Sequence, residues 1–391
     1  MSRVSARSAP ARRALWVLVA LALAVLLGGC SGGYTPSGPF RPLPQGVPPE
    51  VGPPSDSAPA PVPGNPADPE SGQQVGDPNV VASKLAVPTG LAVLPDGSAI
   101  VGERDTGRLL HVFPDRAPAR VLMTVGGLDT TGDGGLLGLA ISPTYAEDGL
   151  IYAYLSTATD NRVVRFPIGG RPNPVLTGIP HGAQRNGGGL VFAPDGTLFV
   201  GTGDTGNPAL ARDPESLAGK VLHIDVFGHA LNAGGPVYSR GLGDVTALCQ
   251  GADDRLYATD AVPGGPDELD RVSRGGDYGW PTVSSTSIAP ITTLPDAEGG
   301  LAGCAVDART VFLGTLNGKR IDVLPLKADG TAGKMTDVLA DRYGRLRTVV
   351  LDSDGALWIT TSNRDGFGTP TADDDRVLRI VPPTSSGNSP L

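Results

Sequence analysis

Residues 185–204 read RNGGGLVFAPDGTLFVGTGD. Two short apolar runs flank the turn Pro194-Asp195-Gly196, and the second run ends in glycines followed by Asp204. Glycine after aspartate supplies the positive φ angle that a tight hairpin needs. The stretch therefore predicts a hairpin of two β-strands that leads into an acidic residue.

The same pattern recurs along the chain. Paired apolar runs around a turn also occupy residues 88–101, 136–155, 245–259, 302–314 and 348–359. A further β-type run follows some of them, as at 107–112 and 375–380. Repeats of about 45–55 residues are typical of four-stranded propeller blades. An array of β-sandwiches would not give one recurring hairpin, so the six repeats predict an all-β, six-bladed β-propeller.

The N-terminus has the pattern of an export signal. Four arginines precede an uninterrupted apolar run from Ala14 to Leu27, and Leu27-Gly28-Gly29-Cys30 resembles a bacterial lipobox. The alternative is a transmembrane anchor, but the run is shorter than the roughly 20 residues that span a bilayer. We expect residues 1–29 to be a lipoprotein signal peptide. Cys30 would then carry acyl chains, such as palmitate, that anchor the exported protein on the outer face of the cell membrane.

Proline dominates the next segment. Residues 31–78 contain 14 prolines among glycine, serine and alanine. Such a composition has too little apolar surface to bury and favours an extended, disordered chain. We expect residues 30–79 to be a tether, either a stalk through a cell wall or a linker of no set length. The propeller would then occupy residues 80–383, followed by a disordered tail at 384–391.

The charge of the chain argues against one class of partner. The formal net charge is −9, although the leader alone contributes four arginines. No cluster of lysine and arginine stands out in the remainder. Because acidic chains are repelled by phosphate backbones, nucleic acid is excluded as a partner.

Two cysteines remain after Cys30 is assigned to the lipid. In an exported protein, an even count favours a disulfide between Cys249 and Cys304. Two buried free thiols are the alternative. A catalytic cysteine is disfavoured because no histidine lies near either residue in the sequence.

Four motifs resemble a single family. They are GDGGLLGLA at 132–140, AGKVLHID at 218–225, DELD at 267–270 with GDYGWP at 276–281, and RLR at 345–347. Together they resemble the glucose/sorbosone dehydrogenase family over about Leu85 to Pro382, with Asp270 and Asp277 where that family has asparagine. The resemblance implies a six-bladed propeller that oxidises a sugar hydroxyl with pyrroloquinoline quinone (PQQ) and Ca²⁺.

Within that family, the chain most resembles mycobacterial lipoproteins of the LppZ type. The lipobox, the proline-rich segment and the run TDNRVVR at 159–165 carry this likeness. The surroundings of both remaining cysteines also look shared, which supports the disulfide.

The resemblance implies a catalytic site with one conspicuous change. The family's base is a histidine, and Arg185 occupies its position. A guanidinium stays protonated in proteins, so Arg185 cannot accept the hydroxyl proton. The candidate catalytic residues are then Asp204, at the acidic position that orients the histidine, and Asp133, near the substrate. His181 is the third candidate if its loop is rerouted, and Asp204 could instead pair with Arg185.

The implied cofactor site is also altered. Arg345 and Arg347 match arginines that hold the quinone. Gly243 and Asn317 replace an arginine and a lysine, and Asp244 replaces an asparagine. Two lost cations and one added acid should weaken binding of a polyanion by several kcal/mol, at roughly 1.5–3 kcal/mol for each charged hydrogen bond.

A metal site is implied beside the quinone. The backbone carbonyl groups of Val262 and Pro263 align with those that bind Ca²⁺ in the family. Carbonyl oxygens are hard ligands of the kind that Ca²⁺ prefers.

Two functions are compatible with these residues. In the first, the protein is a membrane-anchored propeller that has lost its base and binds a small sugar, a glycan or a protein at the central opening. In the second, it is a PQQ- and Ca²⁺-dependent sugar dehydrogenase with rearranged catalytic groups. Binding of PQQ would discriminate between them.

Overall fold

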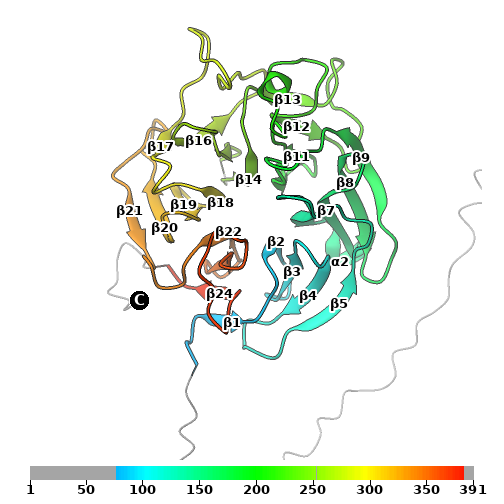
Figure 1. The fold of residues 1–391 in the computed structure, drawn as a ribbon, viewed down its shortest axis with the longest axis vertical. Helices are drawn as coiled ribbons and strands as arrows, with labels where there is room; N and C mark the ends of the chain where they lie inside the picture. The colour runs from blue at the N-terminus through cyan, green and yellow to red at the C-terminus, as the bar shows by residue number, and fades with distance from the viewer. Residues whose placement is uncertain (1–75, 252, 383–391) are drawn as a thin grey trace, which may run out of the picture. The chain divides into compact units, whose positions relative to one another are not determined.

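The computed structural model describes residues 76–251 and 253–382. These residues form six four-stranded antiparallel sheets around a central opening, which confirms the predicted six-bladed propeller (Figure 1). The expected signal peptide, Cys30, most of the tether and the tail lie outside the described residues. In the part of the chain that is described, no helix is long and apolar enough to cross a membrane.

Five blades are built from consecutive strands, in order from the axis outward. The first two are β2 (Pro88–Val93), β3 (Ala99–Glu103), β4 (Arg108–Val112), β5 (Arg120–Thr124), and β6 (Leu136–Ile141), β7 (Leu150–Ser156), β8 (Asn161–Pro167), β9 (Asn173–Ile179). The next two are β10 (Leu190–Phe192), β11 (Leu198–Gly201), β12 (Lys220–Ile224), β13 (Val237–Arg240), and β14 (Val245–Gln250), β15 (Leu256–Asp260), β16 (Asp267–Val272), β17 (Thr292–Leu294). The fifth is β18 (Leu301–Asp307), β19 (Thr310–Thr315), β20 (Arg320–Pro325), β21 (Thr336–Val338). Two short helical segments, α2 (Tyr145–Asp148) and η1 (Pro208–Ala211), lie between strands.

The last blade joins the two ends of the propeller. It contains β22 (Leu346–Leu351), β23 (Leu357–Thr361) and β24 (Val377–Ile380), and its outermost strand is β1 (Val80–Ala82) from the start of the domain. Val80 pairs with Leu378, and Ala82 pairs with Val377. This pairing closes the ring and covers an edge that would otherwise expose unpaired backbone groups.

The apolar core is divided into six clusters, one at each interface between neighbouring blades. Between the first two blades, for example, Ile100 and Leu109 pack against Leu136 and Ile151. Each blade is thus buried on both faces by its neighbours. No blade could bury its apolar surface alone, which explains why the repeats fold as one ring.

The predicted Asp-Gly turns connect the two innermost strands of their blades. Gly97 has a φ angle of 81°. Asp96 accepts hydrogen bonds from the backbone nitrogen of Ser98 at 3.0 Å and from its hydroxyl at 2.6 Å, and Nε2 of His111 lies 2.7 Å from that hydroxyl. Asp195, Thr197 and His223 repeat the arrangement in the third blade. Because the hydroxyl donates to the aspartate, it ties the turn to the third strand and is not an activated nucleophile.

Cys249 and Cys304 form a disulfide, which confirms that prediction over two free thiols. Their Cα atoms are 5.7 Å apart. The bond joins β14 to β18, the inner strands of two neighbouring blades, and closes a segment with a sequence separation of 55 residues.

The disulfide should contribute measurably to stability. For a closed segment of this length, chain entropy alone gives about 4 kcal/mol, and measured effects are typically about 2–4 kcal/mol. We expect the double variant Cys249→Ala/Cys304→Ala to lose that much free energy of unfolding in urea. Reductant should destabilise the natural protein and leave the double variant unchanged. Equal stability of the two proteins under oxidising conditions would contradict the prediction.

Candidate functional site at the mouth of the propeller

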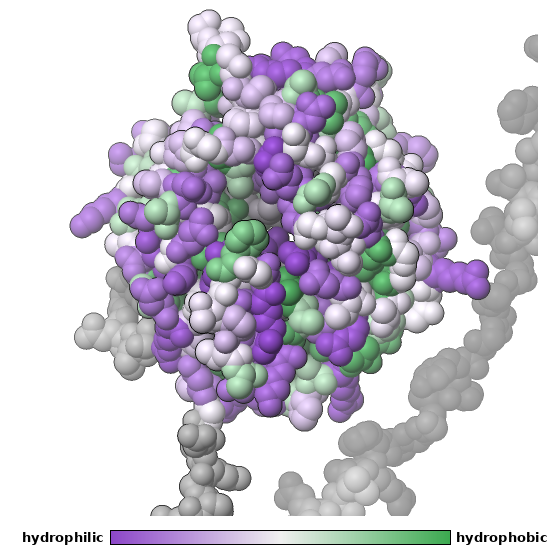
Figure 2. Space-filling view, viewed as in Figure 1, coloured by the Kyte–Doolittle hydropathy of each residue, from purple (hydrophilic) through white to green (hydrophobic). Residues whose placement is uncertain are grey.

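The six inner strands enclose a channel of about 450 Å³ along the axis. Its wall is largely apolar and includes Leu139, Phe192, Leu248 and Val349. Figure 2 shows that the surface around the central opening is, by contrast, mostly hydrophilic. Asp133, Arg185, Asp244 and Arg347 lie just before the runs that line the channel, and we call this end the mouth.

Arg185 is held against Asp204. The Nε atom of Arg185 lies 2.6 Å from Oδ1 of Asp204, and Asp204 is fully buried. Asp204 also accepts hydrogen bonds from Trp280 Nε1 at 2.8 Å and from the backbone nitrogen of Gly206 at 2.8 Å. The predicted pairing of these two residues therefore occurs, and both oxygens of the Asp204 carboxylate accept hydrogen bonds.

The backbone at this point is strained and tightly packed. Arg185 has a φ angle of 57°, in the left-handed region that costs an L-residue about 1–2 kcal/mol. Its carbonyl accepts a hydrogen bond from Thr205 at 3.0 Å. A side chain at Gly203 would place its Cβ only 2.0 Å from that same carbonyl oxygen. The glycine before Asp204 is needed so that the two loops can approach each other.

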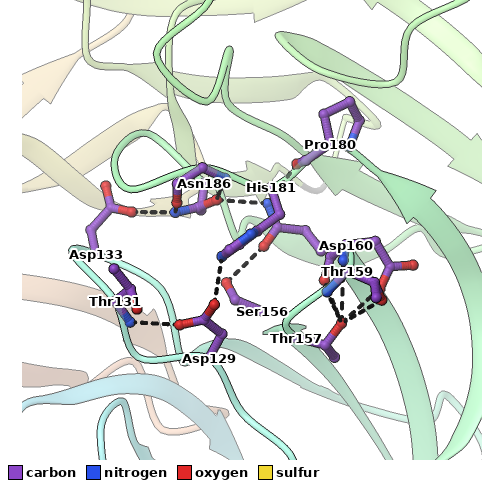
Figure 3. A network of polar contacts seen from close by, with 12 residues as sticks. Asp129, Thr131, Asp133, Ser156, Thr157, Thr159, Asp160, Pro180, His181 and Asn186 are labelled. Carbon is purple, nitrogen blue, oxygen red and sulfur yellow. Dashed lines mark hydrogen bonds and ion pairs between the residues drawn. The ribbon is translucent and has the colours of Figure 1, made fainter.

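Asn186 organises the loop next to Arg185 (Figure 3). Its Oδ1 atom accepts hydrogen bonds from Asn161 at 2.8 Å and from the Gly182 backbone at 3.0 Å. Its Nδ2 atom donates to the Gly182 carbonyl and to Asp133. The second oxygen of Asp133 accepts the backbone N–H of Arg185. Asp133 therefore lies beside Arg185.

His181 does not take the place of the missing base. Figure 3 shows its ring directed toward Asp129, and its Nε2 atom is 3.6 Å from Oδ2 of Asp129. Among the described residues, it has no contact with Arg185 or Asp204. The prediction that His181 could reach the site by rerouting of its loop is not supported by this geometry.

Three groups with altered proton affinity meet at the channel entrance. Burial raises the pKa of Asp133, although hydrogen bonds from Asn186 and Arg185 oppose this. Burial, with the nearby charge of Asp133, raises the pKa of Asp244 well above its ordinary value. Burial and the charge of Arg104 lower the pKa of Arg347. Arg347 is half-buried, and among the described residues its guanidinium has no hydrogen bond or ion pair.

The second retained arginine is already engaged. Nε of Arg345 donates to Asp365 Oδ2 at 2.9 Å, and Nη1 donates to Asn317 Oδ1 at 3.1 Å. Asn317, which replaces a lysine of the family, therefore contacts Arg345. Its side-chain oxygen accepts a hydrogen bond from one of the donors with which Arg345 would hold a cofactor. Gly243 contributes only its backbone, which donates to the carboxylate of Asp260 at 2.8 Å.

The predicted metal ligands and an acidic cluster lie close together in the chain. The carbonyl of Val262 accepts a hydrogen bond from Gly265 at 3.2 Å, and Pro263 follows it in the same turn. Carboxylate oxygens of Asp260, Glu268 and Asp270 lie within 4.8 Å of one another. Of the described residues, these three could together hold a divalent cation, because hard oxygen ligands suit Ca²⁺.

Sequence reasoning missed four residues that the mouth depends on. They are Asn186, Trp280, Asp260 and Asp365. Trp280 lies in the recognised GDYGWP motif, so the sequence drew attention to this residue. Nothing in the sequence indicated its long-range contact with Asp204. Asn186 and Asp365 are polar residues in loops and Asp260 ends β15, and only the closed ring brings the three to one place.

The fold and the site define a six-bladed propeller with a polar mouth over an apolar channel. The family model for glucose/sorbosone dehydrogenase matches residues 85–301, and the chain belongs to that family. A structure of the PQQ-bound aldose sugar dehydrogenase from Streptomyces coelicolor is 37% identical, with a TM-score of 0.74 over 77% of this chain and 96% of that one. The aldose sugar dehydrogenase of Escherichia coli K12 is 25% identical over 73% of this chain and 90% of its own length. Quinoprotein glucose dehydrogenase B of Acinetobacter calcoaceticus is 26% identical over 53% of each chain.

Removing the guanidinium of Arg185 should destabilise the fold. Arg185→Met leaves the buried Asp204 carboxylate without its counter-charge, and we expect a loss of about 3 kcal/mol in the free energy of unfolding. The matched control is Arg255→Met, because Arg255 forms a 3.2 Å pair with Asp253 in which both side chains are much more exposed. That control should change stability by less than about 0.5 kcal/mol. Equal losses in the two variants would show that Trp280 and Gly206 alone hold Asp204.

The acidic cluster should make stability depend on pH. Asp270 is fully buried, and neither of its oxygens has a hydrogen-bond partner among the described residues. Burial raises the pKa of Asp260 to about 6 and of Glu268 to about 7, and raises the pKa of Asp270 well above its ordinary value. The folded state binds these protons more tightly than the unfolded state does. The stability that the three protonated carboxyl groups contribute is therefore present in full below about pH 4 and is lost as the pH rises through 6 and 7.

The variant Asp270→Asn tests this dependence. In EDTA, the natural protein should lose stability between pH 5 and pH 8, and the variant should be more stable by about 1–3 kcal/mol at pH 8. Asp307→Asn is the control, since Asp307 is exposed. An unchanged pH slope in Asp270→Asn would contradict the prediction.

Proposed function

We propose that this protein is a lipid-anchored propeller of the bacterial cell envelope that binds sugars at its mouth without oxidising them. The observation that carries the proposal is Arg185, whose guanidinium lies on Asp204 where the family has a base. A base needs a free electron pair near neutral pH, and a guanidinium has none to offer. The lipid on Cys30 and the tether are part of the proposal and rest on the sequence alone.

The groups at the mouth do not fit a polyanionic quinone. Arg345 is paired with Asp365 and Asn317, which leaves Arg347 as the one unpaired guanidinium that we assign to the mouth. Asp133 and Asp244 stand beside it. Position 243 has no room for the lost arginine, since a Cβ there would lie 2.9 Å from the Ala261 carbonyl oxygen. We therefore infer that PQQ is not retained.

The same groups suit the hydroxyls of a sugar. A protonated carboxyl both donates and accepts hydrogen bonds, and an unpaired guanidinium donates several. Burial favours the protonated forms of Asp133 and Asp244. A neutral, polyhydroxylated ring can use all three groups without bringing a charge into the recess, which favours a sugar over a polyanion.

A second function has an observation in its favour. The 37% identity to a PQQ-bound aldose sugar dehydrogenase, together with retained Arg345 and Arg347, supports an active sugar dehydrogenase with rearranged groups. This function requires tight binding of PQQ and a base other than Arg185.

Calorimetry with PQQ and Ca²⁺ separates the two functions. We expect no saturable PQQ binding to the full-length protein and no dye-linked oxidation of glucose, because the mouth lacks a base and two of the cations that hold the quinone in the family. The Escherichia coli aldose sugar dehydrogenase, treated in parallel, serves as the positive control. We expect saturable glucose binding, weakened about tenfold by Arg347→Gln. Robust glucose oxidation would overturn the proposal, and so would the absence of any sugar binding.

A further inference from the structure

The loop between β23 and β24 presents an aromatic ring beside the mouth. β23 runs toward the mouth, since Thr361 at its end pairs with Leu346, which lies between Arg345 and Arg347 in the sequence. Figure 1 shows this part of the last blade beside the central opening. Phe367 in the loop is 85% exposed, the most exposed large hydrophobic residue of the described chain. Exposure of a whole aromatic ring leaves apolar area that a ligand can cover.

The ring is held in place by groups of the mouth. Asp365 accepts the backbone N–H of Phe367 through Oδ1 at 2.9 Å and the Nε of Arg345 through Oδ2 at 2.9 Å. The guanidinium carbon of Arg345 lies 5.7 Å from the centre of the Phe367 ring. Asp365 is buried, with 4% of its side chain exposed. The buried Asp365 carboxylate therefore connects the loop that carries the exposed ring to Arg345, and this loop presents the ring to solvent.

Two glycines fit the loop to this purpose. Gly366 has a φ angle of 93°, and a Cβ at Gly368 would lie 2.5 Å from the carbonyl oxygen of Asn363. The chain therefore turns tightly on both sides of Phe367. The Phe367 side chain between the two glycines is exposed.

We propose that Phe367 is a second sugar-binding position, so that the ligand of the mouth is a neutral glycan of at least two sugar units. This inference rests on the proposed sugar-binding function and extends it. The apolar C–H face of a sugar ring packs on Phe367, beside the guanidinium of Arg345, whose carbon lies 5.7 Å from the centre of the Phe367 ring. Aromatic area with a few fixed polar groups is the usual composition of small-molecule sites.

The charges beside the ring favour a neutral glycan. Arg345 and Asp365 neutralise each other in an ion pair of 2.9 Å. An anionic sugar would have to compete with Asp365 for Arg345, and a cationic one would have to compete with Arg345 for Asp365. Neither competition arises for uncharged hydroxyls.

The test compares one sugar unit with several. Binding of glucose, maltotriose and cellotriose to the full-length protein is measured by calorimetry for the natural protein, Phe367→Ala and Phe227→Ala. Phe227 is the matched control, because it is 60% exposed and has the guanidinium of Arg165 at 4.7 Å from its ring, but follows β12 at the end of the blade away from Asp204.

We expect at least one trisaccharide to bind more tightly than glucose. Phe367→Ala should weaken trisaccharide binding about tenfold and leave glucose binding unchanged, as expected for one well-placed aromatic contact. Phe227→Ala should change neither. In protein with ¹³C-labelled phenylalanine, the Phe367 ring resonance, assigned by its loss in the variant, should shift with the trisaccharide and not with glucose.

Three outcomes would overturn the proposal. If glucose binds but Phe367→Ala leaves trisaccharide binding intact, the second position fails while the proposed function stands. If the natural protein binds neither glucose nor a trisaccharide, both fail. If sedimentation shows self-association that Phe367→Ala abolishes, the ring is covered by a second copy of this chain.

Discussion

The antiparallel pairing of β1 with β24 is the constraint on which the rest of the structure depends. It joins residues from the two ends of the domain in one blade and so closes the ring. The mouth is assembled from loops of different blades: Asp133 follows the first, Arg185 the second, Asp244 the third, and Arg347 begins the last. Their mutual distances are set by ring closure and not by any local structure.

The Arg185–Asp204 pair shows how the fold can keep a stabilising contact when the residue at the base position differs from that of the family. Asp204 is buried and would be costly to leave unpaired, whatever residue faces it. A histidine in the family and an arginine here both satisfy it, but only the histidine can also accept a proton. Arg185 therefore keeps a partner on the buried carboxylate. Position 243 also keeps a stabilising contact. The backbone N–H of Gly243 donates a hydrogen bond to Asp260, and a Cβ atom there would come too close to the Ala261 carbonyl oxygen.

The sequence allowed the fold to be predicted, because its determinants are local. Each hairpin carries its own turn signal, and Gly97, Gly196 and Gly355 all adopt the positive φ angles that the Asp-Gly pattern requires. The disulfide could be predicted because two cysteines remain once Cys30 is assigned to the lipid, and the Arg185–Asp204 pair could be considered because the family pattern places these positions together. What could not be predicted is the role of β1, which is too short to signal a strand. The contacts of Asn186, Trp280 and Asp365 could not be predicted either, because each spans loops far apart in the chain.

The position of Phe367 also depends on both local and distant residues. Gly366 and Gly368 allow the chain to turn tightly at Phe367, and Arg345 supports this turn through Asp365. Arg345 is a residue that the family uses for the quinone, and here its donors go to Asp365 and Asn317. This guanidinium therefore fixes a loop and lies 5.7 Å from the centre of an aromatic ring. A side chain that matches a quinone-binding arginine of the family thus also determines which surface the neighbouring loop presents.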